Sequence, residues 1–452
     1  MRALLPFLFA SFVLSAQTGD LKVAPNHRFL TYANGKPFFY LGDTAWELFH
    51  RLNREEAEKY LENRRAKGFT VIQAVVLAEL DGLNTPNANG DKPLIDNDPA
   101  KPNEAYFKQV DLIVETANRK GLYIGMLPTW GDKVVQTKWG VGPIIFTPEN
   151  ARAWGRFIGM RYGNAPNIVW ILGGDRTATG YESVWREMAA GIQSGDEGRH
   201  LITFHPDGGH SSAEYFHAEP WLSFNMAQSG HHARDIANYE MIRKDCSLSP
   251  TKPCMDGEPR YENHPVNWEP EKKGWFDEAD VRQGAYWAVF AGAHGHTYGC
   301  HDIWQMKAPG RDPVGHARGT WYESLDLPGA GQMQYVKRLI LSRPFLVREP
   351  DQTIIDGDAG AGPDHIQATR GADYAFVYVP TGKPVAVKMG RISGKRTAAW
   401  WYNPRTGEAT RIGDFDNSGS RTFTPAGSPG KGNDWVLVLD DASRKYSAPG
   451  TP

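Results

Sequence analysis

"NIVWILGGDR", residues 167–176, is the stretch that decides the fold. Five apolar residues in a row, 168–172, are typical of a parallel strand that is covered on both faces. The strand then runs into Gly173, Gly174 and Asp175. We predict that the rigid strand places the carboxylate and that the bare glycine backbone lets a substrate approach it. An acid ahead of "TATGYESVW" can also cap the next helix, and the sequence leaves both interpretations open.

Strand-like and helix-like segments alternate along the chain from residue 36 onward. The eight strand-like segments span residues 36–46, 70–80, 122–132, 167–176, 201–209, 221–232, 252–262 and 295–304. The alternation is least clear at 221–232. This pattern predicts an α/β fold, a (β/α)8 barrel over residues 20–345, rather than an open doubly wound sheet. No GxGxxG motif follows the first strand, which disfavours a dinucleotide-binding fold.

The residue pattern of the sequence changes after Pro344. Helical periodicity ends, and short strand-like segments follow, separated by Gly, Pro, Asn and Asp turns. The segment "NPRTGE", residues 403–408, is a good hairpin turn. We therefore predict a small all-β sandwich domain over residues 346–445.

The first 16 residues have the pattern of a secretory signal peptide. One arginine precedes an apolar stretch at 3–13, and small residues follow around Ala16. The apolar stretch is too short to span a membrane as a stable helix. We expect cleavage near Ala16 and an exported protein, periplasmic or extracellular.

Three cysteines leave one pairing open. Cys246 and Cys254 flank a loop short enough to close with a disulfide in an oxidising compartment, which would leave Cys300 over. The sequence does not decide whether that bond forms. No CxxC spacing supports metal binding by these residues.

Charge and composition exclude some partners. The formal net charge is −2 and no polybasic run occurs, so we expect neither nucleic acid nor a membrane as a partner. The 15 tryptophans suit a large core and equally suit sugar rings stacked on indole faces. We expect the protein to act as a monomer.

In a barrel of this kind, catalytic groups project from the C-terminal ends of the strands. The predicted strand ends carry carboxylates, amides, histidines and aromatic rings, without a GxSxG elbow, a phosphate-cradling loop or an HExxH motif. This set favours glycoside hydrolysis, because carboxylates and amides bind hydroxyls and indoles cover ring faces. The candidate substrate-binding residues are Asp43, Trp46, Trp130, His205, Gln228, Arg260, His296 and Tyr298.

Two of the acids are candidate catalytic residues. Asp175 follows the fourth strand, and Glu258 follows the seventh, in "CMDGEPRYE". Strands four and seven face each other across a barrel mouth, which makes the carboxyl spacing of about 5–5.5 Å of a retaining glycosidase reachable. Arg260 either holds Glu258 ionised or forms a plain structural ion pair. Asp43 either binds sugar hydroxyls or caps a helix.

The histidines of "HGHTYGCH", residues 294–301, raise the question of a metal site. Two imidazoles two residues apart share one face of a strand, but no obvious third ligand joins them. Sugar-binding clefts also use neutral histidines as donors. We therefore predict no metal and no cofactor.

Four stretches together resemble the apiosidase-like glycoside hydrolases of family 140. They are "GKPFFYLGDTAWELFHRL" (35–52), "NIVWILGGDR", "MDGEPRYE" (255–262) and "RQGAYWAVFAGAHGHTYGCHDIW" (282–304). The resemblance runs from about residue 22 to the C-terminus. It implies a (β/α)8 barrel with a C-terminal β-sandwich, and release of apiose from pectin side chains.

The resemblance also implies residue roles. Asp175 takes the place of the family's acid/base and Glu258 that of its nucleophile, in a retaining mechanism. Many related barrels carry Asn-Glu where this chain has Gly174-Asp175, so the shorter acid must be brought closer by the backbone or by the substrate. The C-terminal domain resembles one labelled collagen-binding, although nothing in the sequence supports collagen as a ligand. We expect that domain to pack on the barrel or to contribute to the rim of the cleft.

The residues predict a secreted glycosidase, and the resemblance implies that it is a retaining enzyme that releases a terminal sugar, apiose, from plant pectic polysaccharide or oligosaccharide. Two alternatives stay open: a glycosidase of other specificity, such as an arabinofuranosidase, and a non-catalytic carbohydrate-binding protein on a barrel scaffold. The loop at 81–98, after the second strand, is expected to form part of the substrate-binding wall.

Overall fold

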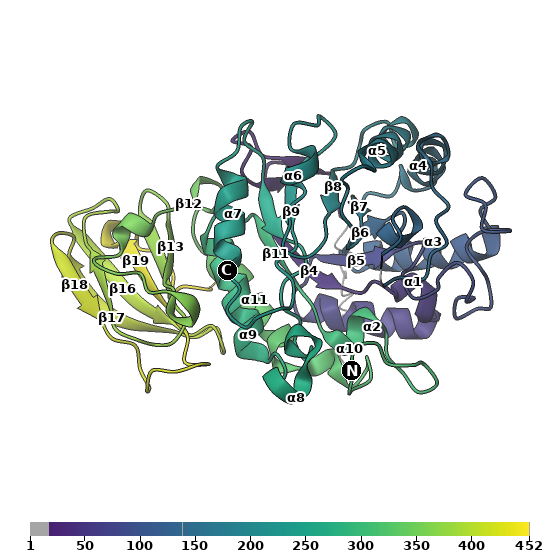
Figure 1. The fold of residues 1–452 in the computed structure, drawn as a ribbon. Helices are drawn as coiled ribbons and strands as arrows, with labels where there is room; N and C mark the ends of the chain where they lie inside the picture. Colours follow the sequence, from purple (N-terminus) through teal and green to yellow (C-terminus); the bar gives the residue numbers. More distant parts are fainter. Residues whose placement is uncertain (1–17, 138, 452) are drawn as a thin grey trace, which may run out of the picture.

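The computed structural model describes residues 18–137 and 139–451, which form a barrel and a separate β domain (Figure 1). Eight parallel strands make the barrel sheet, in the order β8-β7-β6-β5-β4-β11-β10-β9. The two strands that end this order, β8 and β9, contact each other, so the sheet nearly closes on itself. The predicted fold class is confirmed. The predicted signal peptide lies outside the described residues.

Each barrel strand falls inside one of the eight predicted segments. Their bounds are β4 (Tyr40–Thr44), β5 (Val71–Val75), β6 (Tyr123–Leu127), β7 (Ile168–Gly173), β8 (Ile202–His205), β9 (Asn225–Ala227), β10 (Cys254–Asp256) and β11 (Gly295–Tyr298). All six residues of β7 are buried, as expected for a strand covered on both faces. The weak pattern at 221–232 has a simple cause, because β9 is only three residues long.

Helices lie between and after the barrel strands in the chain. They are α1 (Leu48–Arg51), α2 (Arg54–Ala66), α3 (Glu104–Arg119), α4 (Pro148–Tyr162), α5 (Glu182–Gly195), α6 (Ala213–Phe216), α7 (Asn238–Cys246), α8 (Pro270–Lys273), α9 (Glu278–Phe290), α10 (His301–Trp304) and α11 (Pro328–Leu341). Local sequence fixes several of their starts. Asn53 and Glu56, for example, form a reciprocal capping box at the start of α2. No helix in the described part of the chain is long and apolar enough to cross a membrane.

A small antiparallel sheet precedes the barrel and was not predicted. It consists of β1 (Leu21–Val23), β2 (Leu30–Tyr32) and β3 (Pro37–Phe38). Leu21, Leu30 and Phe38 pack in one apolar cluster with the inward-facing side chains of the barrel strands. Because β3 leads directly into the start of β4, this sheet closes the N-terminal end of the barrel and leaves the opposite end for the site.

The C-terminal domain consists of β-strands with a few single-turn 3-10 helices between or after them. Its six-stranded antiparallel sheet contains β12 (Glu349–Pro350), β13 (Gln367–Arg370), β14 (Tyr374–Val379), β19 (Trp435–Asp441), β16 (Arg396–Tyr402) and β17 (Ala409–Asp416), and a second sheet pairs β15 (Val385–Lys388) with β18 (Ser420–Phe423). Val387 and Phe423 of the small sheet pack in one core with Val377 and Leu437 of the large one.

The β domain packs on helix α9 of the barrel (Figure 1). Tyr286 stacks on Tyr378 with a ring-centroid separation of 4.9 Å. Arg282 makes two hydrogen bonds to Asp434, at 2.7 and 3.1 Å, with both side chains almost fully buried. Such a desolvated, bidentate pair fixes one domain against the other.

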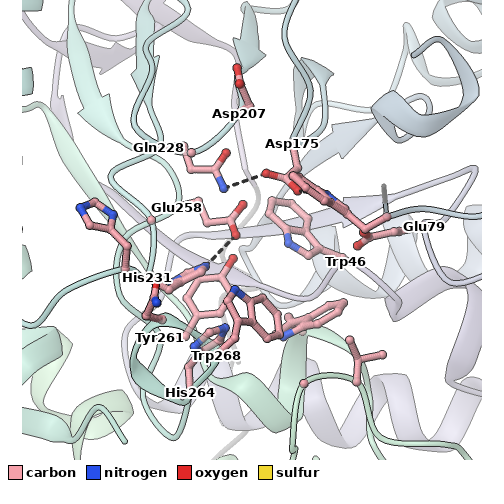
Figure 2. Close-up of a pocket in the computed structure, with 18 of the residues that line it drawn as sticks. Trp46, Glu79, Asp175, Asp207, Gln228, His231, Glu258, Tyr261, His264 and Trp268 are labelled. Carbon is pink, nitrogen blue, oxygen red and sulfur yellow. Dashed lines mark hydrogen bonds and ion pairs between the residues drawn. The ribbon is translucent and has the colours of Figure 1, made fainter. Parts of the chain in front are cut away.

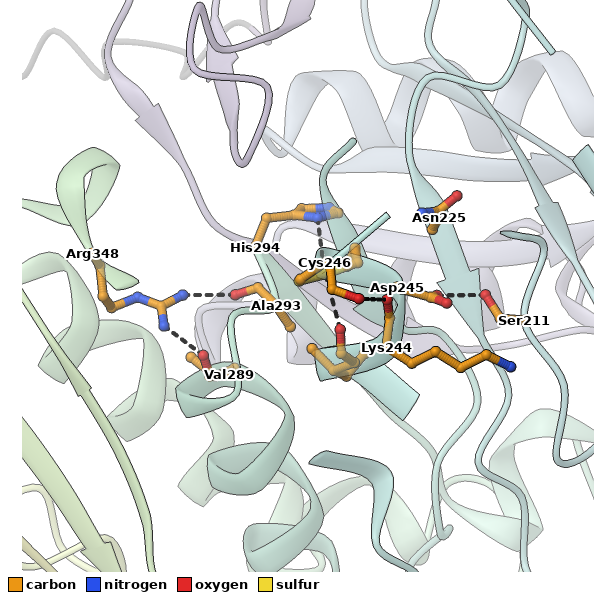
Figure 3. Close-up of a disulfide and its surroundings, with 12 residues drawn as sticks. Ser211, Asn225, Lys244, Asp245, Cys246, Val289, Ala293, His294 and Arg348 are labelled. Atoms are coloured by element: carbon orange, nitrogen blue, oxygen red, sulfur yellow. Dashed lines mark hydrogen bonds between the residues drawn. A yellow bond between two sulfur atoms is a disulfide. The ribbon is translucent and has the colours of Figure 1, made fainter. Parts of the chain in front are cut away.

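A disulfide joins Cys246 and Cys254, with an S–S distance of 2.06 Å (Figure 3). It ties the last residue of α7 to the first residue of β10, the strand that leads to Glu258. The question that the sequence left open is thus answered by the structure. Cys300 is buried and unpaired.

Candidate active site

A cavity of about 780 Å³ lies at the C-terminal end of the barrel strands (Figure 2). Each of the eight strands is followed closely in the chain by a residue that lines it, in the way expected for this fold. Those residues are Trp46, Glu79, Trp130, Asp175, Asp207, Gln228, Glu258 and Trp304. All the lining residues fall between positions 46 and 315, so the cavity is built by the barrel and not by the β domain.

Asp175 stands on a turn that only glycines permit. The backbone φ angles of Gly173 and Gly174 are +90° and +119°, and Asp175 itself has a φ of +53°. A Cβ on Gly173 would lie 2.2 Å from the His205 carbonyl oxygen, and one on Gly174 would lie 2.7 Å from the Trp130 ring. The glycines therefore serve the turn and the packing behind it, which corrects the expectation that they make room for a substrate. A capping role is also excluded, because Tyr181 holds the N-cap position of α5.

Three side chains of the described residues contact the Asp175 carboxyl group. Trp139 Nε1 donates to Oδ2 at 2.9 Å, and Arg176 Nη1 donates to the same oxygen at 3.4 Å. Gln228 Nε2 donates to Oδ1 at 3.2 Å (Figure 2). The side chain retains 23% exposure, so the group is enclosed by protein and still open to the cavity.

Two histidines hold the Glu258 carboxyl group. His231 Nε2 lies 3.1 Å from Oε1, and His205 Nε2 lies 2.9 Å from Oε2, although off the ideal hydrogen-bond direction. The backbone N–H of Asp175 donates to His205 Nδ1 at 3.4 Å, so a neutral His205 carries its proton on Nε2, towards Glu258. The imidazole of His205 thereby connects the two acids.

The surroundings shift the pKa values of the two carboxyl groups in opposite directions. Burial opposes ionisation of Glu258, but His205 and His231 outweigh it and lower the pKa of Glu258 to about 2. Burial and the nearby charge of Glu258 raise the pKa of Asp175, against the opposing effects of Trp139, Arg176 and His205. The cavity thus holds one carboxyl group whose surroundings favour the protonated form and one whose surroundings favour the ionised form.

Glu79 is a third acid in the cavity wall. Burial and the negative charges of Asp175 and Asp132 raise its pKa well above the usual range. A protonated carboxyl group is a hydrogen-bond donor as well as an acceptor. Glu79 can therefore bind a hydroxyl group of a substrate without adding negative charge beside Asp175.

Aromatic rings form much of the cavity wall around the acids. Trp46 and Trp130 lie together, with ring centroids 5.1 Å apart. Tyr261, Trp268 and Trp304 also line the cavity, and Trp268 is 47% exposed. A flat, partly exposed ring such as that of Trp268 is suited to cover the apolar face of a sugar ring.

Six of the ten predicted site residues meet at this place. Asp175, Glu258, Trp46, Trp130 and Gln228 line the cavity, and His205 lies buried between the two acids. The other four, Asp43, Arg260, His296 and Tyr298, are not among the lining residues.

The contacts of those four residues correct their predicted roles. Asp43 is fully buried and paired with Arg64 Nε at 2.6 Å, so it belongs to the barrel wall. The hydroxyl group of Tyr298 donates to Glu262 at 2.6 Å, and His296 is buried on β11. Arg260 donates to the carbonyl oxygen of Arg234, and Glu258 is held ionised by histidines instead.

The loop at 81–98 was expected to form part of the substrate-binding wall, but none of its residues lines the cavity.

Several residues that line the cavity were not selected from the sequence. His231, Tyr261, His264 and Trp268 reach the cavity from loops after β9 and β10. The sequence offered one signal for such residues, a position just after a strand. Of the residues that were missed, only Glu79 and His231 have such a position.

His264 extends the histidine cluster away from Glu258. Its ring stacks on His231, with centroids 4.4 Å apart, and meets the ring of His301 at the same separation. Burial lowers the pKa of His264 well below the usual range. Among the residues that the structure describes, no group of three or more His, Cys, Asp or Glu is placed to hold a metal ion.

Comparisons with known proteins show the family of this chain. A family model described as the apiosidase-like catalytic domain matches residues 24–347, and one described as a collagen-binding domain of a collagenase matches residues 349–440. A solved structure named glycoside hydrolase is 38% identical, with a TM-score of 0.88 over 95% of this chain and 98% of that one. A glycoside hydrolase family 5 structure from Bacteroides vulgatus ATCC 8482 is 36% identical, with a TM-score of 0.89 over 95% of each chain. No curated protein matches the chain.

The barrel, the acids at its strand ends and these likenesses define a glycoside hydrolase, an enzyme that acts on a carbohydrate substrate. More narrowly, the chain belongs to the apiosidase-like family, whose catalytic-domain model covers most of it. Membership in family 140 itself stays a prediction.

Proposed function

We propose that this glycoside hydrolase releases a terminal sugar, apiose, from the side chains of plant pectic polysaccharides with retention of configuration. The proposal rests on one observation: in a single cavity, the pKa of Asp175 is raised and that of Glu258 is lowered. A protonated and an ionised carboxyl group are the pair that a two-carboxylate glycosidase requires. Retention follows from the family resemblance, which gives Glu258 the place of a nucleophile.

In the first step, the Glu258 carboxylate attacks the anomeric carbon while Asp175 gives its proton to the departing glycosidic oxygen. The bond to the leaving group breaks, and a glycosyl ester of Glu258 forms. In the second step, Asp175, now a carboxylate, takes a proton from a water molecule that attacks the anomeric carbon and releases Glu258. His205 and His231 stabilise the Glu258 carboxylate before attack and after release.

The preference for apiose rests on the apiosidase-like family. The cavity adds acids and several aromatic rings in one place, which suits a sugar as the substrate. An arabinofuranoside is also a terminal five-carbon sugar and is the nearest alternative substrate.

We also propose that the protein is exported. The predicted signal peptide supports this, and so does the disulfide between Cys246 and Cys254, since such bonds persist in oxidising compartments.

Sugar release from an apiose-containing pectin fraction tests the function. We compare the unmodified enzyme with Asp175→Asn and Glu258→Gln, and we take Asp207→Asn as the matched control, because Asp207 lines the same cavity without contacting either acid. Apiose should be released by the unmodified enzyme and the control and lost in both test variants. Proton NMR of the first product should show the retained anomer.

Other results would overturn parts of the proposal. Release of arabinose instead of apiose would show that the proposed substrate is wrong, but it would leave the assignment of the two catalytic acids unchanged. Turnover that survives in both test variants would mean that other residues are the acid and the nucleophile. Formation of the inverted anomer as the first product would contradict the proposed double-displacement mechanism.

A further inference from the structure

The two oxygens of the Asp175 carboxyl group have different partners. Oδ2 accepts from Trp139 Nε1 at 2.9 Å and from Arg176 Nη1 at 3.4 Å. Among the residues that the structure describes, Oδ1 has only the Gln228 amide as a partner, at 3.2 Å. An indole and a guanidinium group are donors without any acceptor capacity, whereas an amide is both.

This difference decides where a proton can sit. If Oδ2 carried the proton, its O–H would face donors that cannot accept it. If Oδ1 carries the proton, the Gln228 amide can turn over and present Oε1, which is buried and has no partner in the present orientation. Protonation at Oδ1 therefore leaves every hydrogen bond of the group satisfied.

Trp139 is itself held in place by the same arginine. Arg176 Nη2 donates to the Trp139 carbonyl oxygen at 2.6 Å, and the guanidinium lies 5.2 Å from the centre of the indole. The Trp139 side chain is 54% exposed at the rim of the cavity. A ring so exposed contributes little to the core, so its contact with Asp175 is its most specific interaction.

We propose that Trp139 is a positioning residue for the general acid: its N–H keeps Oδ2 as an acceptor and thereby places the transferable proton on Oδ1. This inference rests on the proposed role of Asp175 as acid and base. It adds which oxygen delivers the proton and which residue selects that oxygen.

Several charged and titratable groups face Asp175 besides Trp139. Glu258 lies across the cavity, and His205 reaches the backbone of Asp175 from β8. Arg176 contacts it from the neighbouring position, and Glu79 interacts with it from the loop after β5. A test must therefore change the indole N–H and leave all four of these groups in place.

Trp139→Phe makes that change, because it keeps an aromatic ring over Arg176 and removes the donor. Trp268→Phe is the matched control, since Trp268 is another exposed indole in the cavity wall and contacts neither acid. The substrates are two synthetic apiosides, one with a dinitrophenolate leaving group and one with an alkoxide leaving group. Departure of the dinitrophenolate needs no proton from Asp175.

In Trp139→Phe, kcat/KM for the alkyl apioside should fall at least about tenfold, a part of the 10²–10⁴-fold that general acid catalysis supplies. The value for the dinitrophenyl apioside should stay nearly unchanged. The basic limb of the pH profile should move to higher pH, because the lost donor had lowered the pKa of Asp175. Trp268→Phe changes another ring of the cavity wall, so it should alter kcat/KM by the same factor on both apiosides and leave the pH profile in place.

Carbon-13 NMR of Asp-labelled protein supplies a readout that needs no turnover. The carboxyl resonance of Asp175, assigned with Asp175→Asn, should titrate at higher pH in Trp139→Phe than in the unmodified protein or in Trp268→Phe. An unchanged titration, or an equal loss of kcat/KM on both apiosides, would overturn the inference and leave Trp139 as a sugar-stacking ring. If the unmodified enzyme cleaves neither apioside, the proposed substrate fails, and the titration alone decides whether Trp139 controls this carboxyl group.

Discussion

His205 Nε2 lies 2.9 Å from Glu258 Oε2, and the other nitrogen of the same ring faces the backbone N–H of Asp175. One imidazole thus couples the group proposed as nucleophile to the turn that carries the proposed acid. Together with His231, it keeps Glu258 ionised without an arginine in contact. Histidine donors hold the carboxylate without the permanent charge that would also pull the proton off Asp175.

The low pKa of Glu258 makes a prediction for His231→Phe. The phenyl ring preserves the stack on His264, but the donor to Oε1 is lost. Burial is then opposed by His205 alone, so the pKa of Glu258 should rise from about 2. Because Glu258 must be ionised to attack, the acid limb of kcat/KM should move up by about one pH unit, which corresponds to roughly 1.4 kcal/mol.

His232→Phe is the control for that pH profile, because His232 is the next residue, is exposed and lines the same cavity. Its profile should coincide with that of the unmodified enzyme. An acid limb that stays in place in His231→Phe would show that His231 does not stabilise the carboxylate.

The turn before Asp175 makes a second prediction, for Gly174→Ala. The methyl group would lie 2.7 Å from the Trp130 ring and 2.8 Å from the backbone nitrogen of Gly131, at a φ of +119°. Strain and overpacking should therefore displace Asp175. A misplacement of about 1 Å costs on the order of a hundredfold in rate, so kcat/KM should fall by at least about that factor.

Gly180→Ala separates backbone strain from crowding. Gly180 follows the same strand and has a φ of +84°, but a Cβ there would meet nothing within 4 Å. Chemical denaturation should show Gly174→Ala to be less stable than Gly180→Ala by about 1–3 kcal/mol, the usual cost of overpacking. Equal losses of stability and activity in the two variants would contradict this account of the turn.

The sequence predicted strand ends well because barrel periodicity is a local signal. The apolar run at 168–172 and the following glycines were enough to locate β7 and to select Asp175. The side-chain direction was not encoded in that signal. Asp43 also ends a strand, but its carboxylate turns towards Arg64 and Tyr60 of α2, because those two residues offer partners that a buried acid requires.

The parts of the site that sequence reasoning missed come from longer loops. Trp268 reaches the cavity with a φ of +60°, packed against Gly315 and the ring of His264. The position of the Trp268 side chain depends on its contact with Gly315, which lies about fifty residues further along the chain. No periodicity within either segment encodes such a contact, so only the folded chain reveals it.

The pair that joins the two domains makes a third prediction. Asp434 accepts two hydrogen bonds from Arg282 and one from the hydroxyl group of Tyr378, at 3.2 Å, with its side chain 2% exposed. Asp434→Ala leaves a buried guanidinium without its counter-charge, which typically costs about 3–5 kcal/mol.

Asp416→Ala is the control in the same domain, because the pair of Arg396 and Asp416 is equally short, at 2.7 Å, but is largely exposed. It should cost no more than about 1 kcal/mol in the free energy of unfolding. Thermal unfolding of both variants checks the contrast, and equal midpoints would mean that the Arg282–Asp434 pair does not hold the interface together.

The disulfide makes the last prediction, for the double variant Cys246→Ala/Cys254→Ala. The bond closes a loop with a sequence separation of 8, for which restricting the unfolded chain is worth about 2–3 kcal/mol. Urea unfolding should show that loss in the variant, and reductant should destabilise the unmodified protein by a similar amount while leaving the variant unaffected. Activity in dilute buffer should survive, because Cys254 begins β10 and the site lies beyond the other end of that strand. A loss of kcat/KM without a loss of stability would instead mean that the bond positions Glu258.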